Sequence, residues 1–363
     1  MGDRQCTVEN MGPDTRMSGF WQGKRVLVTG HTGFKGSWLS LWLTELGAQV
    51  YGVALAPDTD PALFDQLGLA QRLDHRIGDI RQTENLRHRV AEVRPDVVFH
   101  LAAQPLVLAS YDDPLLTWDT NVMGTAHMLD ALRGLDQPCA AVMITTDKVY
   151  ENREWCHPYR ESDALGGHDP YSASKAACEL VISSYAKSFF AGSGVRVASA
   201  RAGNVIGGGD WAENRIVPDI VRALSRGQAV PVRNGRARRP WQHVLEPLSG
   251  YLRLAEALSG SQDVASSYNF GPEAADVRPV SDLVAVALQH WPGEWQDRSN
   301  PDAPHEAGLL SLGIELARSD LGYSPRWDFA QAMEQTMGWY RAVLDGASAL
   351  DVTRAQIRAF GAP

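Results

Sequence analysis

The 363-residue chain is poor in cysteine and in basic residues, and it has no long apolar run. Its four cysteines show no metal-ligand spacing, which favours reduced thiols in a cytoplasmic protein. Lysine and arginine number 34 against 43 acidic residues, and this net charge of −9 argues against nucleic acid as the main partner. No stretch reaches the roughly 18 apolar residues of a membrane helix, so we expect no membrane partner.

Two further features are missing. The ten histidines form no H-x-x-x-H pair or similar set, so no metal site is expected. Residues 1–19 lack the apolar centre of a signal peptide and are rich in Gly, Asp, Arg and Asn. We therefore expect a disordered leader over 1–19.

A glycine-rich loop follows the first strand expected in the ordered chain. Residues 24–29 have the pattern of a β-strand, and residues 37–46 have the pattern of a helix. Gly30, Gly33 and Gly36 lie between them. Closely spaced glycines let backbone N–H groups approach a pyrophosphate at the N-terminus of a helix. This context favours dinucleotide binding over a merely structural turn.

The strand–helix alternation then repeats. Strands are expected at 50–55, 76–80, 96–101, 141–146 and 195–201, with helices at 83–92 and 121–132. This order predicts an α/β fold with a doubly wound parallel sheet of the Rossmann type. We expect a dinucleotide-binding Rossmann domain over 20–202 with part of 241–267, and a smaller mixed α/β second domain over 203–240 and 268–363.

Tyr171 and Lys175 are the candidate proton-transfer pair. Pro170 suits the first turn of a helix, so Tyr171 and Lys175, four residues apart, share one helical face. Residues 145–148, Thr-Thr-Asp-Lys, follow a buried strand and should reach the same edge of the sheet. A free phenol has a pKa of about 10, and a neighbouring ammonium favours the phenolate, so Tyr171 is a plausible general base. The alternative is an ordinary amphipathic helix.

The identity of the dinucleotide stays open on these grounds. The acid that would bind the ribose hydroxyls of NAD is missing, since the second strand ends Ala54-Leu55-Ala56 and Asp58 is the first acid after it. Lys35 and later arginines could instead accept the 2′-phosphate of NADP.

A basic segment stands out in this acidic chain. Arg236, Arg238 and Arg239 lie within four residues. Such a cluster is often a solvated surface, but beside a nucleotide pocket it favours a clamp on a diphosphate through guanidinium forks.

Taken together, these motifs resemble the extended short-chain dehydrogenase/reductase superfamily. Within it, the chain is similar to the CDP-D-glucose 4,6-dehydratase family over residues 20–340, most specifically in the segments 20–24, 29–36, 102–106, 121–125, 146–148, 203–211 and 239–247. The resemblance implies an enzyme with tightly held NAD, a nucleotide-sugar substrate and a homodimer. It also implies that NAD is preferred despite the missing acid.

The resemblance assigns roles by position. It implies catalytic roles for Thr146, Asp147, Lys148, Tyr171 and Lys175. It implies cofactor contacts for Gly30, Gly33, Phe34, Gly36, Asp79, Ile80, Leu101, Ala102, Ala103, Thr120, Tyr171 and Lys175. It implies substrate contacts for Gln104, Asn204, Arg215, Arg239 and Asn269. Leu108 and Ala109 stand where the resemblance leads us to expect an arginine-containing pair, so that one substrate contact is not carried over.

The implied reaction is an internal oxidation, dehydration and reduction. Tyr171 removes the O4 proton of the hexose while a hydride passes from C4 to NAD, and Thr146 hydrogen-bonds the same oxygen. Lys148 then acts as base at C5 and Asp147 as acid at the C6 hydroxyl, before the hydride returns to C6. A 4,6-dehydratase or epimerase of another sugar nucleotide (TDP-, UDP- or GDP-linked) and a non-catalytic NAD(P)-binding sensor are the alternatives.

Overall fold

The computed structural model describes residues 17–300 and 307–363. Most of the expected leader, residues 1–16, lies outside the described residues. Residues 17–19 of that leader belong to a helix, α1 (Met17–Trp21), so the expectation of disorder is wrong for these three residues. Trp21 at the end of α1 is fully buried, and its packing in the core explains why the helix is fixed to the domain.

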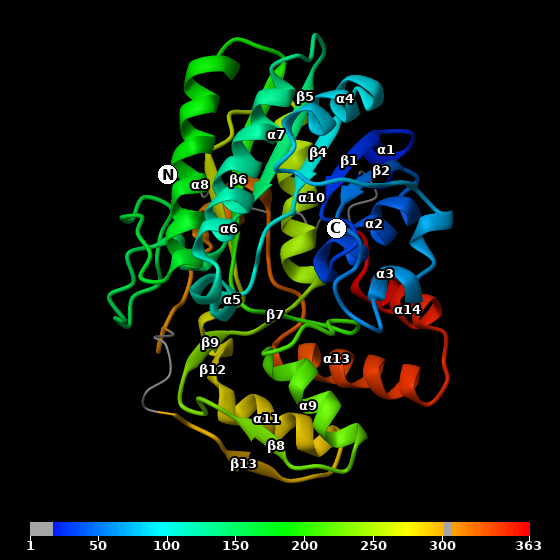
Figure 1. Cartoon of the computed structure of the whole chain (residues 1–363), viewed down its shortest axis with the longest axis vertical. Helices are drawn as coiled ribbons and strands as arrows, with labels where there is room; N and C mark the ends of the chain where they lie inside the picture. The colour runs from blue at the N-terminus through cyan, green and yellow to red at the C-terminus, as the bar shows by residue number, and fades with distance from the viewer. Residues whose placement is uncertain (1–16, 301–306) are drawn as a thin grey trace, which may run out of the picture.

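The main sheet has seven parallel strands in the order β11-β6-β5-β4-β1-β2-β3, which confirms the predicted fold class (Figure 1). The strands are β1 (Arg25–Thr29), β2 (Gln49–Ala54), β3 (Asp74–Ile77), β4 (Val97–His100), β5 (Cys139–Ile144), β6 (Val195–Ala202) and β11 (Ser267–Phe270). β4 and β5 are buried at every residue, as expected for central strands covered on both faces.

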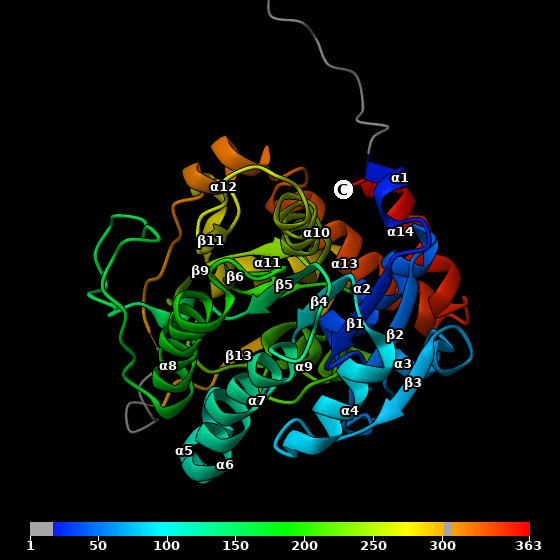
Figure 2. The same cartoon turned by 90° about the horizontal axis from the view of Figure 1, so that it is seen from above.

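Helices cover both faces of this sheet (Figure 2). One face carries α4 (Thr83–Val93), α7 (Gly124–Leu132) and α8 (Pro170–Tyr185), and the other carries α2 (Phe34–Glu45) and α10 (Leu245–Ser259). The predicted helix at 121–132 begins earlier and starts with a π-helical turn, η2 (Asp119–Met123). Shorter elements in the connections are α3 (Leu63–Gln66), η1 (Leu69–Gln71), α5 (Val107–Asp112), α6 (Pro114–Trp118), η3 (Asp147–Val149) and η4 (Ala186–Phe190).

A second layer of structure lies beyond the carboxyl ends of the strands, in the lower half of Figure 1. Its strands form three two-stranded sheets: β7 (Val205–Ile206) with β10 (Gln242–His243), β9 (Arg238–Pro240) with β12 (Val277–Pro279), and β8 (Val230–Val232) with β13 (Trp295–Asp297). Its helices include α9 (Ile216–Ser225), η5 (Ala274–Asp276), α11 (Val280–His290) and α13 (Phe329–Leu344), while α12 (Glu315–Leu321) packs on α10 and α14 (Ala349–Phe360) packs on α2. The domain division remains a prediction, although β11, which it assigned to the second domain, lies in the main sheet beside β6.

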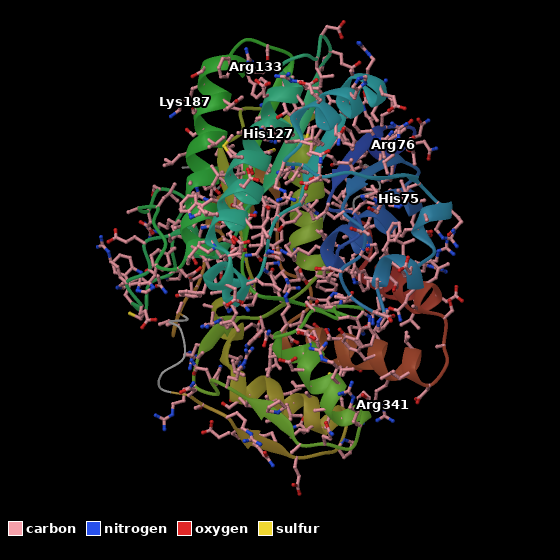
Figure 3. The ribbon with its side chains drawn as sticks, in the orientation of Figure 1. His75, Arg76, His127, Arg133, Lys187 and Arg341 are labelled. Carbon is pink, nitrogen blue, oxygen red and sulfur yellow. The ribbon has the colours of Figure 1, made fainter. Side chains whose placement is uncertain are left out.

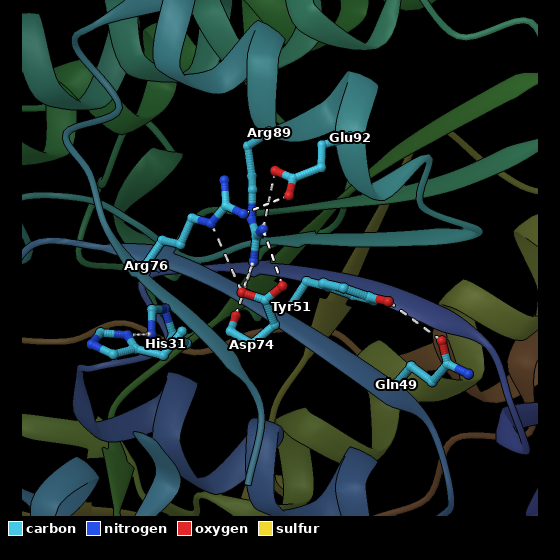
Figure 4. Close-up of polar contacts among 8 residues, drawn as sticks. His31, Gln49, Tyr51, Asp74, Arg76, Arg89 and Glu92 are labelled. Atoms are coloured by element: carbon cyan, nitrogen blue, oxygen red, sulfur yellow. Dashed lines mark hydrogen bonds and ion pairs between the residues drawn. The ribbon is translucent and has the colours of Figure 1, made fainter. Parts of the chain in front are cut away.

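The outer edge strand β3 is held by polar contacts. Arg89 of α4 donates to Asp74 Oδ1 at 2.8 Å, and Arg76 pairs with Glu92 (Figure 4). His75 and Arg76 lie at this margin of the molecule in Figure 3. His75 also meets His31 of the glycine loop, with 2.7 Å between His31 Nε2 and His75 Nδ1. Burial lowers the pKa of His31 to about 4, so the neutral ring anchors the loop to β3.

Candidate active site

A cleft of about 1150 Å³ lies between the carboxyl ends of the sheet strands and the second layer. This is the position at which open α/β sheets bind ligands. The predicted site residues that line it are Gly30, Gly33, Phe34, Gly36, Asp79, Ile80, Leu101, Ala102, Ala103, Gln104, Thr120, Thr146, Asp147, Lys148, Tyr171, Lys175, Asn204, Arg215 and Arg239.

The glycine loop at one end of the cleft depends on its glycines. Gly30 has a φ of 74°, and a Cβ there would lie 2.7 Å from the backbone N of Ala102. A Cβ at Gly36 would collide with the Gly30 carbonyl oxygen. Helix α2 begins at Phe34 and its N-cap, Gly33, offers no side-chain cap, so the N–H groups of the first turn are available to an anion. The loop therefore fits the pyrophosphate of a dinucleotide.

At the adenosine end of the cleft, Asp79 is already paired, while exposed Asp58 also lines the cleft. Asp79 is held by Arg81, whose Nη2 donates to Asp79 Oδ2 at 2.5 Å, and this contact lowers the pKa of the carboxyl. The Thr32 hydroxyl donates to the Leu55 carbonyl at 2.9 Å, which closes the turn after β2.

Lys35, considered above as a possible ligand of the 2′-phosphate of NADP, lies near Tyr251. Its ammonium donates to the Tyr251 hydroxyl on α10 at 3.5 Å. The ammonium also interacts electrostatically with two cations, Arg215 and Lys175, and with the carboxylate of Asp147. Burial and these neighbouring cations lower its pKa to about 8. Lys35 therefore lies near Tyr251, Arg215 and Lys175, a position that does not favour the alternative in which it accepts a 2′-phosphate.

The lowered pKa means that the charged form of Lys35 decreases the free energy of unfolding. The folded protein disfavours the cation, so the penalty is fully present below pH 8 and disappears as the pH rises toward the ordinary value of 10.5. We expect Lys35→Met to raise the free energy of unfolding by about 3 kcal/mol at pH 7, with the gain shrinking above pH 8. Urea titrations of the nucleotide-free protein across this range test it, with exposed Lys187→Met as control. An equal gain at every pH would contradict the assignment.

The proton-transfer pair is set by the start of α8. The Asp169 carboxylate accepts from the Ser172 N–H at 2.9 Å and caps the helix, and Pro170 occupies its first turn as predicted. Tyr171 and Lys175 are 8 % and 6 % exposed and both face the cleft. The Lys175 ammonium donates to the Ile144 carbonyl at 3.2 Å, at the end of β5.

The electrostatics of the pair differ from the expectation. Burial raises the pKa of Tyr171 to about 12, opposed mainly by its hydrogen bond with the Thr146 hydroxyl and by Arg215. Lys175, whose own pKa burial lowers, is committed to a backbone carbonyl. The protein side chains alone therefore leave Tyr171 as a neutral phenol at neutral pH.

Thr146 and Asp147 form a buried pair next to the phenol. Thr146 accepts from the Lys148 N–H at 3.4 Å and so begins the short helix η3, and its hydroxyl donates to Asp147 Oδ1 at 3.0 Å. Asp147 is 2 % exposed, and a Cβ at Gly203 would lie 2.9 Å from its Oδ2, so the carboxylate needs the glycine. Lys148 is half-buried and lines the cleft beside them.

The second layer contributes cations to the other end of the cleft. Arg215, just before α9, pairs with Asp210 at 3.0 Å. In β9 the side chains alternate, so buried Arg239 lines the cleft, while Arg238 is exposed and donates to the Val277 carbonyl. Arg236 is exposed and does not line the cleft, so only one of the three clustered arginines reaches it.

Two predicted substrate contacts are used inside the protein instead. Asn269 is fully buried, does not line the cleft, and bonds with Tyr150 and with the carbonyls of Tyr159 and Gly313. Gln104 lines the cleft, but its amide donates to the Thr117 hydroxyl at 2.9 Å and fixes its own loop.

Sequence reasoning missed several supporting residues. Asp210 orients Arg215, and the Ser110 hydroxyl accepts from the Tyr171 N–H at 3.1 Å. Below the cleft, buried Glu179 pairs with Arg201 at 2.8 Å and accepts from Thr145. The glycine run 207–209 before Asp210 was a usable signal, because repeated glycines mark a close approach of the backbone to its neighbours. The Glu179–Arg201 pair joins a helix to a strand and left no local signal.

The described part of the chain holds no group of three or more His, Cys, Asp or Glu side chains arranged for a metal ion. None of its helices combines the length and the apolar character required to cross a membrane.

Comparison with known proteins agrees with this geometry. Residues 27–336 match the family model described as GDP-mannose 4,6 dehydratase. The chain is 47% identical to a CDP-glucose 4,6-dehydratase of Salmonella typhimurium, over 93% of this chain and 96% of that protein. It is 32% identical to a dTDP-glucose 4,6-dehydratase of Streptomyces antibioticus, over 73% of this chain and 75% of that protein.

Solved structures give the same picture. DesIV, a dTDP-glucose 4,6-dehydratase of Streptomyces venezuelae crystallised with NAD, superposes with a TM-score of 0.75 at 26% identity, covering 90% of this chain and 99% of that one. The superfamily and fold predictions are thereby confirmed, and the chain belongs to the NAD-dependent sugar-nucleotide epimerase and dehydratase family that the GDP-mannose 4,6-dehydratase model describes.

Proposed function

We propose that this protein converts CDP-D-glucose to CDP-4-dehydro-6-deoxy-D-glucose and water, as a hydro-lyase that uses NAD. The observation that carries the proposal is the grouping of Thr146, Asp147 and Lys148 beside Tyr171 at the end of β5, opposite the pyrophosphate loop. A simple 4-epimerase needs no acid and base beyond the tyrosine. The 47% identity to a CDP-glucose 4,6-dehydratase along nearly the whole chain supports the choice of nucleotide.

NAD fits the loop around Gly30 and Gly36, with Leu101, Ala102 and Thr120 along its inner side. When bound, NAD would take up and later return a hydride, and its positive ring would favour the phenolate of a neighbouring tyrosine. Tyr171 then accepts the O4 proton, and the Thr146 hydroxyl orients the same oxygen.

Asp147 and Lys148 of η3 carry out the dehydration in this proposal. Once C4 is a ketone, the C5 proton is acidic, and Lys148 is the base that removes it. Asp147 in its protonated form gives a proton to the C6 hydroxyl, which leaves as water. The burial of Asp147 excludes solvent from this step.

Arg215 and Arg239 are suited to hold the diphosphate of the substrate. Arg239→Met should raise the KM for CDP-glucose by about 10- to 100-fold with a smaller change in kcat, because a charge-assisted contact contributes about 1.5–3 kcal/mol. Arg236→Met removes a nearby exposed arginine outside the cleft and is the matched control. Equal effects of the two substitutions on KM would show that only general charge matters.

We further propose a homodimer in the cytoplasm. Large apolar side chains are exposed on neighbouring elements: Leu115 (79 %) and Trp118 (38 %) on α6, Met123 (47 %) on η2, and Leu180 (64 %) on α8. Exposed apolar side chains on elements that contact one another support the proposal of an interface between two copies. Leu180→Glu should give a monomer in light scattering.

Incubation with CDP-, TDP-, UDP- and GDP-sugars, followed by the alkaline absorbance of a 4-keto product, tests the activity. Turnover of CDP-glucose supports the proposal. Turnover of another nucleotide sugar alone would assign the alternative substrate, and binding of NAD without any turnover would favour a sensor.

A further inference from the structure

The segment that carries the proposed acid and base of dehydration, residues 146–148, is fixed only weakly by its own side chains. Within the described chain, the Asp147 carboxylate accepts a single hydrogen bond, from the neighbouring Thr146 hydroxyl at 3.0 Å, and the Lys148 ammonium has no hydrogen-bond or ion-pair partner. The positions of both groups therefore depend on how the backbone of this acid/base segment is held.

A chain of buried polar side chains reaches both ends of the acid/base segment. Thr145, directly before it, donates to Glu179 Oε1 at 2.5 Å. Arg201 of β6 donates through one terminal nitrogen to Glu179 Oε2 and through the other to the hydroxyl of Tyr150, which follows η3, both at 2.8 Å. The Tyr150 hydroxyl donates in turn to Asn269 Oδ1 at 2.7 Å. One ion pair is thus linked to the residues on either side of the acid/base segment.

This ion pair is itself rigidly held. Glu179 and Arg201 are 5 % and 4 % exposed. The Ser199 hydroxyl also donates to Glu179 at 2.7 Å, Arg201 donates to the Glu161 carbonyl at 3.1 Å, and the guanidinium lies 5.1 Å from the centre of the Tyr150 ring. Hydrogen bonds to charged groups are among the stronger ones, and burial strengthens them further. The pair is therefore a fixed point that both ends of the segment share.

The groups that carry out the first oxidation have anchors of their own. The Tyr171 N–H donates to the Ser110 hydroxyl at 3.1 Å, and the Asn121 amide donates to the Ser174 hydroxyl at 2.9 Å. The start of α8 is therefore held without Tyr150. Loss of the Tyr150 hydroxyl should loosen the acid/base segment while the start of α8 stays in place.

We propose that Glu179 and Arg201 are positioning residues that hold Asp147 and Lys148 in place for dehydration, an inference that rests on the proposed function. Neither lines the cleft, so they act through Thr145 and Tyr150. Their effect falls on the alignment of the acid with the C6 hydroxyl and of the base with the C5 proton. A small misplacement of a reacting group lowers the rate of its step rather than the affinity for substrate.

Tyr150→Phe tests this role without stripping a buried charge of its partner. We expect kcat for CDP-glucose to fall about 10-fold, within the range of about 100-fold that a misplaced group can cost, and KM to change less than about twofold. Because oxidation at C4 continues, reduced nicotinamide should accumulate during turnover. Exchange of the C5 hydrogen with heavy water should slow by the same factor as kcat.

Tyr268→Phe is the matched control. Tyr268 of β11 is also fully buried, and its hydroxyl likewise accepts one hydrogen bond, from the Ala265 N–H at 2.9 Å, and donates another, to Asp320 at 3.0 Å. It does not line the cleft. It should lose as much stability in urea as Tyr150→Phe and keep the wild-type kcat and C5 exchange.

The other end of the segment gives a second test. Thr145→Val should lower kcat about 10-fold, and Thr145→Ser, which keeps the hydroxyl, should restore it. The Thr145 and Tyr150 hydroxyls are joined through Glu179 and Arg201, so the double variant Thr145→Val/Tyr150→Phe should lose little more than either single variant. A loss of about 100-fold, the product of two independent effects, would contradict a shared pair.

Other outcomes also overturn the proposal. If Tyr150→Phe behaves like Tyr268→Phe in every assay, the backbone hydrogen bonds of Val149 and Glu151 to residues 164–166 are enough to fix the segment, and the pair is only structural. A change in KM alone would make Tyr150 a substrate contact. An equal fall in oxidation and dehydration would mean that the pair supports the whole site.

Failure of the proposed function is recognised separately, because the wild-type protein would then make no keto sugar from CDP-glucose. Amide hydrogen exchange of the nucleotide-free protein still decides the structural part in that case. Exchange over residues 145–150 should be faster in Tyr150→Phe than in the wild type and unchanged in Tyr268→Phe. Equal exchange in all three proteins would show that the pair does not hold the segment.

Discussion

Tyr171→Phe should lower turnover of CDP-glucose about 10³-fold, equivalent to about 4 kcal/mol of transition-state free energy. The substitution removes the α8 phenol that lines the cleft with Thr146, and it keeps the aromatic ring. Because Arg215 and Arg239, the proposed contacts of the substrate diphosphate, are unchanged, the KM should change little. Initial rates of 4-keto sugar formation with saturating NAD give both values.

Tyr185→Phe is the matched control for this loss. Tyr185 ends the same helix, where its ring packs on Phe189 and Phe190, away from the cleft. Its substitution should leave turnover near the wild-type value. Retention of substantial activity by Tyr171→Phe would remove the tyrosine from the base role and leave the first proton transfer unexplained.

Lys148→Met should stop the reaction after the first oxidation. The C4 ketone can still form because Tyr171 and Thr146 are unchanged, but no base remains at C5. We expect reduced nicotinamide to build up in the absorbance spectrum, final product to fall about 10³-fold, and exchange of the C5 hydrogen with heavy water to disappear.

The control for this variant is Lys187→Met, which removes an exposed lysine of η4 far from the cleft (Figure 3). It should retain both exchange and product formation. Intact exchange at C5 in Lys148→Met would mean that another group is the base.

The sequence was sufficient where the determinants are local. Pro170, Tyr171 and Lys175 fix their relation by helical spacing, and the structure has the helix begin at Pro170. The glycine loop was likewise predictable, because a strand pattern ends directly before it and a helix pattern begins directly after it. The order of strands and helices gave the parallel sheet, since each βαβ unit is right-handed.

Side-chain direction over long sequence distances was out of reach. Lys35 meets Tyr251, 216 residues away, so its loop alone did not reveal which end of the cleft it serves. The Asn269 side chain is hydrogen-bonded to Tyr150 and Gly313, and only the tertiary fold brings these residues close to it. The choice of Arg239 over Arg238 follows from strand alternation and could have been predicted if β9 had been recognised.

The origin of the hydrogen at C6 tests the central claim most directly. The enzyme is incubated with CDP-glucose carrying deuterium at C4, and the product is analysed by mass spectrometry and NMR. An internal oxidation, dehydration and reduction predicts that the deuterium moves to C6 of the 4-dehydro-6-deoxy sugar within the same molecule. Deuterium that remains at C4, or that is lost to solvent while C6 is reduced, would contradict it.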